Sequence, residues 1–240
     1  MLLRARVAMK TRKIRKPHRL RFPVVAVCSI LFLAQTSAHA GDDQMAPVID
    51  NNRVTVFDVT LNPGKPWTAP KDVDFAEMIL VGGKIRSTTP DGKSSTAARK
   101  SGAVIYVTRG TVATLEASSK DPSRVVIVEL KGPDVPPLPN KSGYPLAFPR
   151  PGAIKVFENN RVIAWNSTWR HGVPIPVHYH DKDIVIVFRD SGSIKSTQLN
   201  GESTVGDNEF GTTRFSKSNR IHSEELISGK GSAIVLELKQ

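Results

Sequence analysis

The sequence predicts an all-β protein built from two copies of one sandwich or barrel unit. Three segments recur in the same order at a spacing of 108 or 109 residues, which indicates an internal repeat. Within each copy, short runs of β-branched and aromatic residues alternate with Gly and Asn-Gly, a pattern typical of strands and turns. No segment shows a sustained helical period. Two packed sheets in each copy would bury the apolar faces of such strands.

Residues 1–40 are typical of a secretory signal peptide. Nine Lys and Arg and no acidic residue precede an apolar run over residues 23–34, and Ala38-His39-Ala40 ends the segment. The apolar run is too short to span a bilayer as a helix. We therefore predict cleavage after Ala40 and a periplasmic or secreted protein. A membrane anchor or a basic binding arm is the alternative.

Removing this segment changes the charge argument. The whole chain has a net charge of +12, but residues 41–240 keep 25 basic against 22 acidic residues, a net charge of +3. That balance gives no reason to expect a nucleic-acid partner. The single cysteine, Cys28, lies in the apolar run, so the remaining 200 residues can form no disulfide and carry no thiol chemistry.

The repeat defines the domain organisation. The matched segments are Asp50–Val54 with Glu158–Val162, Ile85–Lys93 with Ile194–Glu202, and Arg124–Lys131 with Ser232–Lys239. We therefore predict an N-terminal unit over residues 41–131 and a C-terminal unit over residues 153–240. Residues 132–152 contain seven prolines and predict a semi-rigid linker between the units. A segment that binds a partner domain is the alternative for this linker.

Strands are predicted for the β-branched runs of both units. In the first unit they cover residues 54–61, 78–81, 104–107, 111–115 and 124–130. In the second unit they cover residues 161–165, 184–188, 194–198, 211–215, 221–225 and 233–238. Asp91-Gly92 and Asn200-Gly201 stand between such runs and predict tight turns, which need residues that tolerate positive φ.

All four histidines beyond residue 40 lie in the second unit. His178 and His180 are two residues apart, so in a strand they face the same side. His222 lies in a later strand-like segment and can supply a third imidazole. Three neutral imidazoles suit a first-row divalent metal. We predict a metal site of His178, His180 and His222, and we expect His171 at the surface or behind the site.

The two segments that hold these histidines resemble the sequence motifs of the cupin superfamily. Gly172, five residues and His178-Tyr-His180 fit the opening of the first motif. Gly211, five residues, Lys217-x-Asn219, two residues and His222 fit the second, with Lys and Asn where Pro and Gly are usual. Asn is a suitable replacement because it tolerates the left-handed region. The resemblance implies two tandem cupin units, which are jelly-roll β-barrels, with the motif in the C-terminal copy only.

The chain departs from the cupin pattern at one ligand. The position of the usual glutamate is Ile184, and Asp183, the candidate for a fourth ligand, would face the site only if a bulge intervened. The resemblance therefore implies a centre of three histidines, as in some metal-dependent cupin dioxygenases. At a repeat spacing of 108, Pro70 and Asp72 of the first copy correspond to His178 and His180. The first copy is expected to stiffen the protein, cover an edge of the second barrel or hold a dimer together.

Two functions follow as hypotheses. The first is an exported bicupin whose divalent metal (Fe, Mn, Ni, Cu or Zn) supports oxygenase-like chemistry on a small organic molecule. The second is a non-enzymatic protein of the cell envelope that binds a small ligand or metal. A third reading treats the histidines as remnants in a structural protein. Glu224 shares the alternation of His222. We expect it to be a solvated surface residue, and a general base near the metal is the alternative. Trp169 is expected in the core, and a homodimer is compatible with the family.

Overall fold

The computed structural model describes residues 46–132 and 138–239, and these residues form strands without any helix. The predicted signal peptide lies outside the described residues. The first nine strands are β1 (Ile49–Asp50), β2 (Val54–Leu61), β3 (Trp67–Thr68), β4 (Phe75–Val81), β5 (Gly83–Thr88), β6 (Ser94–Arg99), β7 (Val104–Val107), β8 (Thr114–Ala117) and β9 (Ser123–Leu130). The second nine are β10 (Ala153–Glu158), β11 (Val162–Trp169), β12 (Ile175–His180), β13 (Asp183–Phe188), β14 (Gly192–Gln198), β15 (Ser203–Asn208), β16 (Thr213–Ser216), β17 (Arg220–Gly229) and β18 (Gly231–Leu238).

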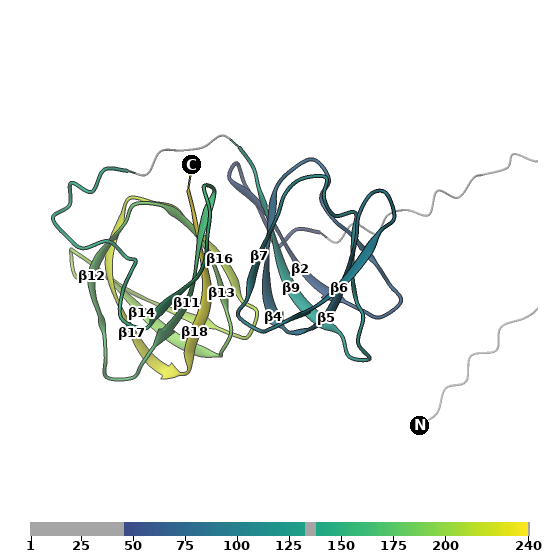
Figure 1. The fold of residues 1–240 in the computed structure, drawn as a ribbon. Coiled ribbons are helices and arrows are strands. Elements are labelled where there is room, and N and C mark those ends of the chain that lie inside the picture. The colour runs from purple at the N-terminus through teal and green to yellow at the C-terminus, as the bar shows by residue number, and fades with distance from the viewer. Residues whose placement is uncertain (1–45, 133–137, 240) are drawn as a thin grey trace, which may run out of the picture. The chain divides into compact units, whose positions relative to one another are not determined.

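The two sets of nine strands form the same sheets in the same order. Figure 1 shows each set as a separate barrel. The first set makes the sheets β1-β2-β9-β4-β7 and β3-β8-β5-β6. The second set makes β10-β11-β18-β13-β16 and β12-β17-β14-β15. No sheet of the described residues contains strands of both sets. The all-β prediction, with two tandem jelly-roll units, is confirmed. No helix in the described part of the chain has the length and apolarity needed to cross a membrane.

The predicted tight turns join neighbouring strands in both copies. Gly92 connects β5 to β6 with a φ of 84°, and Gly201 connects β14 to β15 with a φ of 86°. Residues with a side chain rarely adopt this conformation, so glycine fits both positions. Strands β6, β10 and β15 are among the strands without a prediction, because most of their residues are exposed and their sequences lack the apolar alternation that marks a half-buried strand.

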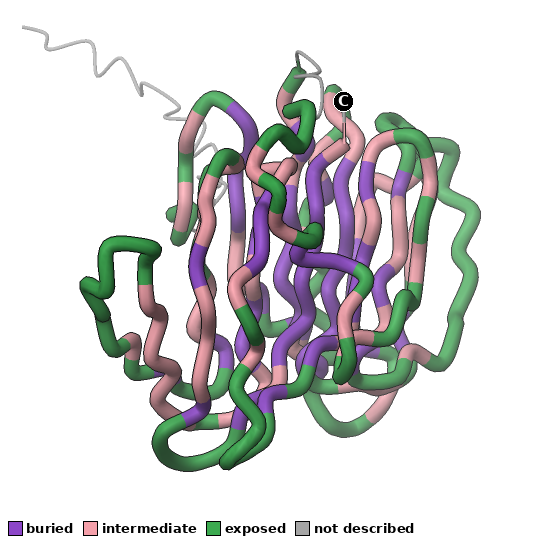
Figure 2. The backbone as a smooth tube through the Cα atoms, turned by 90° about the vertical axis from the view of Figure 1, so that its left-hand side faces the viewer, coloured by how far each residue is buried: buried purple, intermediate pink, exposed green. Residues whose placement is uncertain are grey.

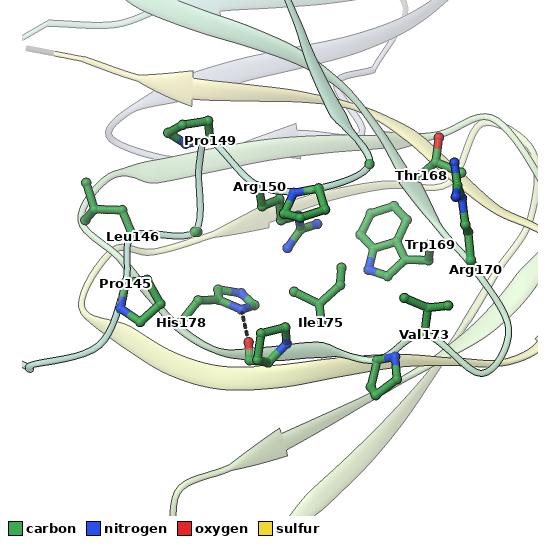
Figure 3. Close-up of a pocket in the computed structure, with 15 residues that line it drawn as sticks. Pro145, Leu146, Pro149, Arg150, Thr168, Trp169, Arg170, Val173, Ile175 and His178 are labelled. Carbon is green, nitrogen blue, oxygen red and sulfur yellow. Dashed lines mark hydrogen bonds between the residues drawn. The ribbon is translucent and has the colours of Figure 1, made fainter.

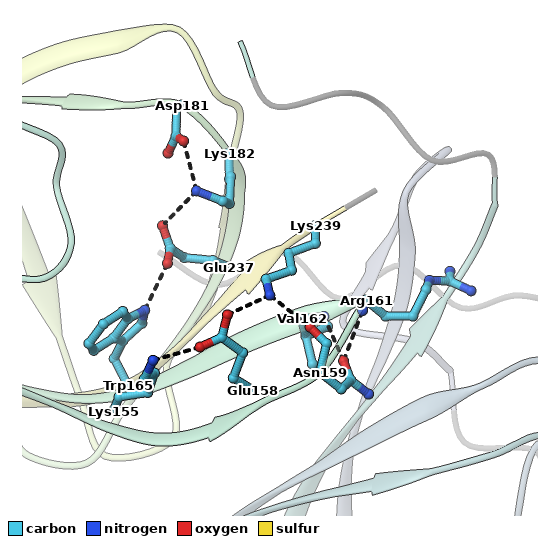
Figure 4. A network of polar contacts seen from close by, with 10 residues as sticks. All are labelled: Lys155, Glu158, Asn159, Arg161, Val162, Trp165, Asp181, Lys182, Glu237 and Lys239. Carbon is cyan, nitrogen blue, oxygen red and sulfur yellow. Dashed lines mark hydrogen bonds and ion pairs between the residues drawn. The ribbon is translucent and has the colours of Figure 1, made fainter. Parts of the chain in front are cut away.

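The repeated Asn-Asn-Arg-Val segment forms the same turn in each copy. Asn51 Oδ1 accepts hydrogen bonds from the N–H groups two and three residues later, at 2.8 and 3.0 Å. Asn159 Oδ1 does the same, with both distances 2.9 Å (Figure 4). Lys239 Nζ then donates to Glu158 at 2.6 Å, and Lys131 pairs with the matching acid of the first copy. The first and third repeated segments therefore bind each other in both copies.

The two five-stranded sheets pack face to face through apolar side chains. This cluster takes residues from β2, β4 and β9 of the first copy and from β11, β13 and β18 of the second. The buried strands appear as the purple stretches of Figure 2. Two ion pairs also join the copies, Arg53 with Asp183 at 3.2 Å and Arg161 with Asp74 at 3.5 Å. The first copy thus covers a sheet face of the second copy rather than an edge.

Candidate metal centre

Strands β12 and β17 bring the three predicted histidines together. His178 and His222 lie opposite each other in the antiparallel ladder, and His180 follows on the same face of β12. His180 Nε2 lies 3.2 Å from His178 Nε2 and 3.1 Å from His222 Nε2. The three residues are only 3%, 3% and 1% exposed. Metal binding by them remains a prediction, but their Nε2 atoms converge on one point inside the barrel.

Hydrogen bonds at the far ring nitrogens orient two of these imidazoles. His178 Nδ1 lies 2.8 Å from the carbonyl oxygen of Pro176 (Figure 3). A carbonyl can only accept, so Nδ1 of the neutral ring carries the proton and Nε2 keeps its lone pair. His222 Nδ1 lies 2.6 Å from Ser196 Oγ, which holds the second ring. Such partners behind a ligating histidine fix both the tautomer and the ring orientation.

Glu224 adds a carboxylate to the cluster. One ligand atom of Glu224 and one of each histidine all lie within 4.8 Å of one another. Glu224 Oε1 is 3.7 Å from His222 Nε2, while Oε2 accepts hydrogen bonds from Arg150 Nη1 at 3.0 Å and from Trp169 Nε1 at 2.8 Å. The Glu224 side chain is 11% exposed, so the expectation of a solvated surface residue is wrong. Its shared alternation with His222 was the signal that could place it.

The electrostatic environment sets the protonation of the four residues. Burial, helped by the charge of Arg220, lowers the pKa of His180 to about 2. Burial lowers the pKa of His222 to about 4, against the opposing charge of Glu224. Burial alone would raise the pKa of Glu224, but the charges of Arg150 and the histidines outweigh it and lower the pKa to about 2. At neutral pH the cluster therefore holds neutral imidazoles and an ionised carboxylate, the forms that bind metals.

The proline-rich segment contributes to the site. Ala147 N–H donates to the Tyr179 carbonyl and Tyr179 N–H donates to the Pro145 carbonyl, both at 2.8 Å, so this segment lies along β12. It thereby places Arg150 against Glu224, where the Arg150 side chain is only 7% exposed. The sequence predicts a spacer for residues 132–152, and nothing in the local pattern distinguishes Arg150 from a surface arginine.

Two cavities flank the cluster. One of about 310 Å³ lies under the proline-rich segment, with Ile175 and His178 in its wall (Figure 3). The other, of about 270 Å³, lies inside the second barrel and is lined by β13 to β17, including His222 and Glu224. Trp169 lines both cavities. A ligand can thus reach the cluster from the apolar proline side or from the more polar barrel side.

Comparisons with known proteins show the fold. No family model matches the sequence, and no curated protein matches it. A cupin 2 conserved barrel domain protein from Leptotrichia buccalis is 13% identical with a TM-score of 0.50, covering 80% of this chain and 87% of its own. A variant of Bacillus subtilis oxalate decarboxylase is 11% identical with a TM-score of 0.56, covering 79% and 70%. Protein Ylba from E. coli is 11% identical with a TM-score of 0.51, covering 82% and 88%. The chain has the bicupin fold.

The carboxylate of the cluster comes from an unexpected strand. Asp183 pairs with Arg53 and accepts a hydrogen bond from Ser218 N–H at 2.7 Å, so it lies outside the cluster and the idea of Asp183 as a fourth ligand is wrong. Ile184 is 2% exposed and packs in the apolar core of the second barrel. The carboxylate instead stands on β17, two residues after His222. Asn219 has a φ of 61°, which confirms that it takes the glycine position of the turn before β17.

The residues of this cluster fit a bound metal ion. Nitrogen atoms that each lie about 2.0–2.1 Å from one metal ion lie about 2.8–3.4 Å from each other, for ligand angles between octahedral and tetrahedral values. The two Nε2 separations of 3.2 and 3.1 Å fall within that interval. Three imidazole nitrogens and one carboxylate oxygen are also a donor set that first-row divalent ions accept.

Proposed function

We propose that this bicupin is a metal-dependent enzyme that performs oxygenase-like chemistry on a small organic molecule. The carrying observation is the convergence of three buried Nε2 atoms and a carboxylate in the protonation states that bind metals. His178, His180, His222 and Glu224 are the proposed ligands. The fold similarity to cupin proteins supports a site at this place in the barrel, but the chemistry rests on the side chains themselves.

Mn²⁺ or Fe²⁺ is the metal that the donor set favours. Imidazole suits most first-row divalent ions, whereas a carboxylate ligand favours harder ions such as Mn²⁺. Bacillus subtilis oxalate decarboxylase, whose fold is similar at a TM-score of 0.55, has Mn(II) centres. When bound, such an ion supplies a Lewis acid with coordination positions open to substrate and dioxygen.

The protein's own part in this function is to fix the orientation of the ligand side chains and to keep them buried. Arg150 and Trp169 bind Glu224 Oε2, which leaves Oε1 turned toward His222. Ser196 holds the His222 ring from behind. Because these partners are themselves buried or half-buried, the ligand set is arranged before any ion arrives, which reduces the reorganisation that binding requires.

Metal analysis tests the proposal. The protein, purified without chelator from cells that express the full chain, is expected to contain nearly one equivalent of Mn or Fe by mass spectrometry. The variant with His178→Ala, His180→Ala and His222→Ala should contain less than one tenth of that. Glu224→Gln should bind metal at least tenfold more weakly, while Glu225→Gln, whose half-exposed side chain pairs with Lys195, is the matched control. An equal metal content in the triple variant and the wild type would refute the site.

A non-enzymatic metal or ligand carrier is the second candidate, and the low exposure of all three imidazoles favours it, because a nearly enclosed ligand set also suits an ion that is only held. Oxygen uptake separates the two functions. With the metal-loaded protein and a panel of small organic acids and phenols, uptake that disappears in the triple variant supports the enzyme. Full metal occupancy without uptake or any substrate turnover supports the carrier.

We further propose that the protein acts outside the cytoplasm. The basic, apolar and Ala-x-Ala order of residues 1–40 supports this proposal, as does the lack of cysteine in residues 41–240. N-terminal sequencing of the protein from an envelope extract should begin at Gly41. A protein that keeps residues 1–40 and stays with the cytoplasmic fraction would contradict it.

A further inference from the structure

Arg220 is a largely buried cation that faces the barrel cavity. It stands two residues before His222 and four before Glu224 on β17, so all three side chains share the inner face of the strand and line the cavity. Arg220 Nη1 donates to Ser216 Oγ at 3.2 Å, and its buried Nε has no hydrogen-bond partner. Among the described residues, no carboxylate forms an ion pair with Arg220, although a charge in such a place is costly unless it is paired.

Arg214 brings a second positive charge to the same cavity from β16. Its Nη2 donates to the Asp207 carbonyl at 2.8 Å, and its guanidinium lies over the Phe188 ring at 5.8 Å. Gly206 makes room for it, since a Cβ at that residue would lie 2.7 Å from Arg214 Nη1. No ion pair of Arg214 is found with any described carboxylate.

The charge balance of the cavity is therefore positive. Arg214, Arg220 and Glu224 are the charged residues in its wall. The charge of Glu224 is already matched by Arg150, which lies outside this cavity. An anion that enters would meet two guanidinium groups, while the remaining wall offers hydroxyl and amide groups beside the apolar side chains of Ile186 and Ile194.

We propose that the barrel cavity binds a small organic carboxylate, with Arg220 as its anchor and Arg214 as a second contact. A guanidinium binds a carboxylate through two parallel hydrogen bonds, and the Arg220 side chain lines the cavity without a carboxylate in ion-pair contact among the described residues. A cavity of about 270 Å³ suits a small molecule. The apolar wall favours a carboxylate with a carbon skeleton over inorganic phosphate, which has the same charge chemistry without one. This inference gives the substrate class of the proposed enzyme. Only the reaction after binding rests on the proposed function; carboxylate binding itself does not.

Calorimetry on the chelator-treated, metal-free protein tests the inference apart from the metal. The probes are acetate, succinate and benzoate, each beside its neutral amide (acetamide, succinamide and benzamide), with inorganic phosphate as a further arm. At least one carboxylate is expected to bind ten times more tightly than its amide and than phosphate. Arg220→Gln should weaken that binding at least tenfold and Arg220→Lys less, while Arg109→Gln, an exposed arginine of the first copy, should not change it.

Arg214→Gln is the second test variant, because its exposed side chain can be replaced with little risk to folding. It should weaken carboxylate binding by about threefold or more. Carboxylates that bind no better than their amides, phosphate that binds best, or unchanged binding in both arginine variants would overturn the inference. Carboxylate binding in a protein that never takes up metal would leave the inference standing and refute the proposed enzyme. Metal binding without a preference for carboxylates would overturn the inference and leave the proposed metal site standing.

Discussion

The two barrels have the same strand order but different interiors. In the second barrel, His178 faces His222 across the β12–β17 ladder. In the first barrel, the corresponding ladder brings Ala69 next to Ala113, with Ala69 N–H donating to the Ala113 carbonyl at 2.8 Å. Two alanines thus stand where the second barrel has two metal-ligand candidates. The ladder gives a repeat spacing of 109 at this point. Pro70 and Asp72, which correspond to His178 and His180 at a spacing of 108, therefore each lie one residue after the true counterpart.

The carboxylate position differs in the same way. Ser196 pairs with Glu224 in the second barrel, and the matching Ser87 pairs with Leu115 in the first. Leu115 is fully buried in an apolar cluster that fills the interior of the first barrel. The first barrel therefore has the same strand order without the cluster of three histidines and a carboxylate. The polar cluster of the second barrel is therefore best explained by function, since buried polar groups stabilise less than the apolar packing of its twin.

The largest expected effect is on the free energy of unfolding, and it should differ between two Arg–Glu pairs, one in each barrel. Arg150→Met leaves Glu224 buried without its cation and should lower the free energy of unfolding by about 3–5 kcal/mol. Arg86→Met removes an arginine that is 45% exposed and leaves Glu116 with the hydrogen bond from Gly64 N–H, so the loss should be clearly smaller. Urea unfolding of the metal-free proteins measures both. Adding Glu224→Gln to Arg150→Met should recover part of the loss, and equal losses for the two single variants would contradict the burial argument.

Leu115→Ala tests the apolar half of the comparison. Removing a fully buried leucine leaves a cavity and should lower the free energy of unfolding by about 2–5 kcal/mol. The metal content at 25 °C should stay that of the wild type, because the site lies in the other barrel. Urea unfolding and metal analysis on the same sample check this. Loss of metal in a folded Leu115→Ala protein would show that the two interiors are coupled.

The pH dependence of stability should come from the second barrel. The folded-state pKa of His222 is lowered to about 4 by burial, below its ordinary value of 6.5. Below pH 6.5 the unfolded chain therefore takes up a proton at His222 that the folded, metal-free protein does not. As the pH is lowered, the free energy of unfolding should fall by up to about 1.4 kcal/mol per pH unit for this residue. His222→Gln should make the fall of the urea midpoint between pH 6.5 and 4.5 less steep without abolishing it, because burial also lowers the pKa of His178 and His180. A variant with the slope of the wild type would contradict the neutral, buried imidazole.

The smallest effect is expected for the fourth histidine. His171 is exposed and its Nε2 lies 2.8 Å from the Gly229 carbonyl. His171→Ala should change the free energy of unfolding by less than about 0.5 kcal/mol, as surface substitutions usually do, and leave the metal content unchanged. Thermal unfolding and metal analysis give both numbers. A loss of metal would extend the site beyond the four clustered residues.

The sequence allowed much of this fold to be predicted because its signals are local or repeated. Asn200-Gly201 marks a turn by itself, and the matched segments place equivalent strands in both copies. The spacing of His178 and His180 sets their common face whatever surrounds them. Asn219 could be assigned to a left-handed turn because few other residues tolerate one.

The rest of the site depends on packing that local patterns do not contain. Alternation puts Glu224 on the face of His222, but burial follows from the neighbours that close over it. Arg150 reaches Glu224 only because the proline-rich segment lies along β12, a contact between residues 74 positions apart. The polar role of Trp169 likewise depends on Glu224, which its indole N–H meets across 55 positions. Such pairings require the folded chain.

Anomalous diffraction from crystals of the natively purified protein tests the central claim most directly. Data collected at the absorption edge of the bound metal should show one strong peak in each chain, about 2.0–2.2 Å from the Nε2 atoms of His178, His180 and His222 and from Glu224 Oε1. The interior of the first barrel, which Leu115 and its neighbours fill, should show none. A peak in the first barrel, or an occupied metal bound away from these four residues, would contradict the account.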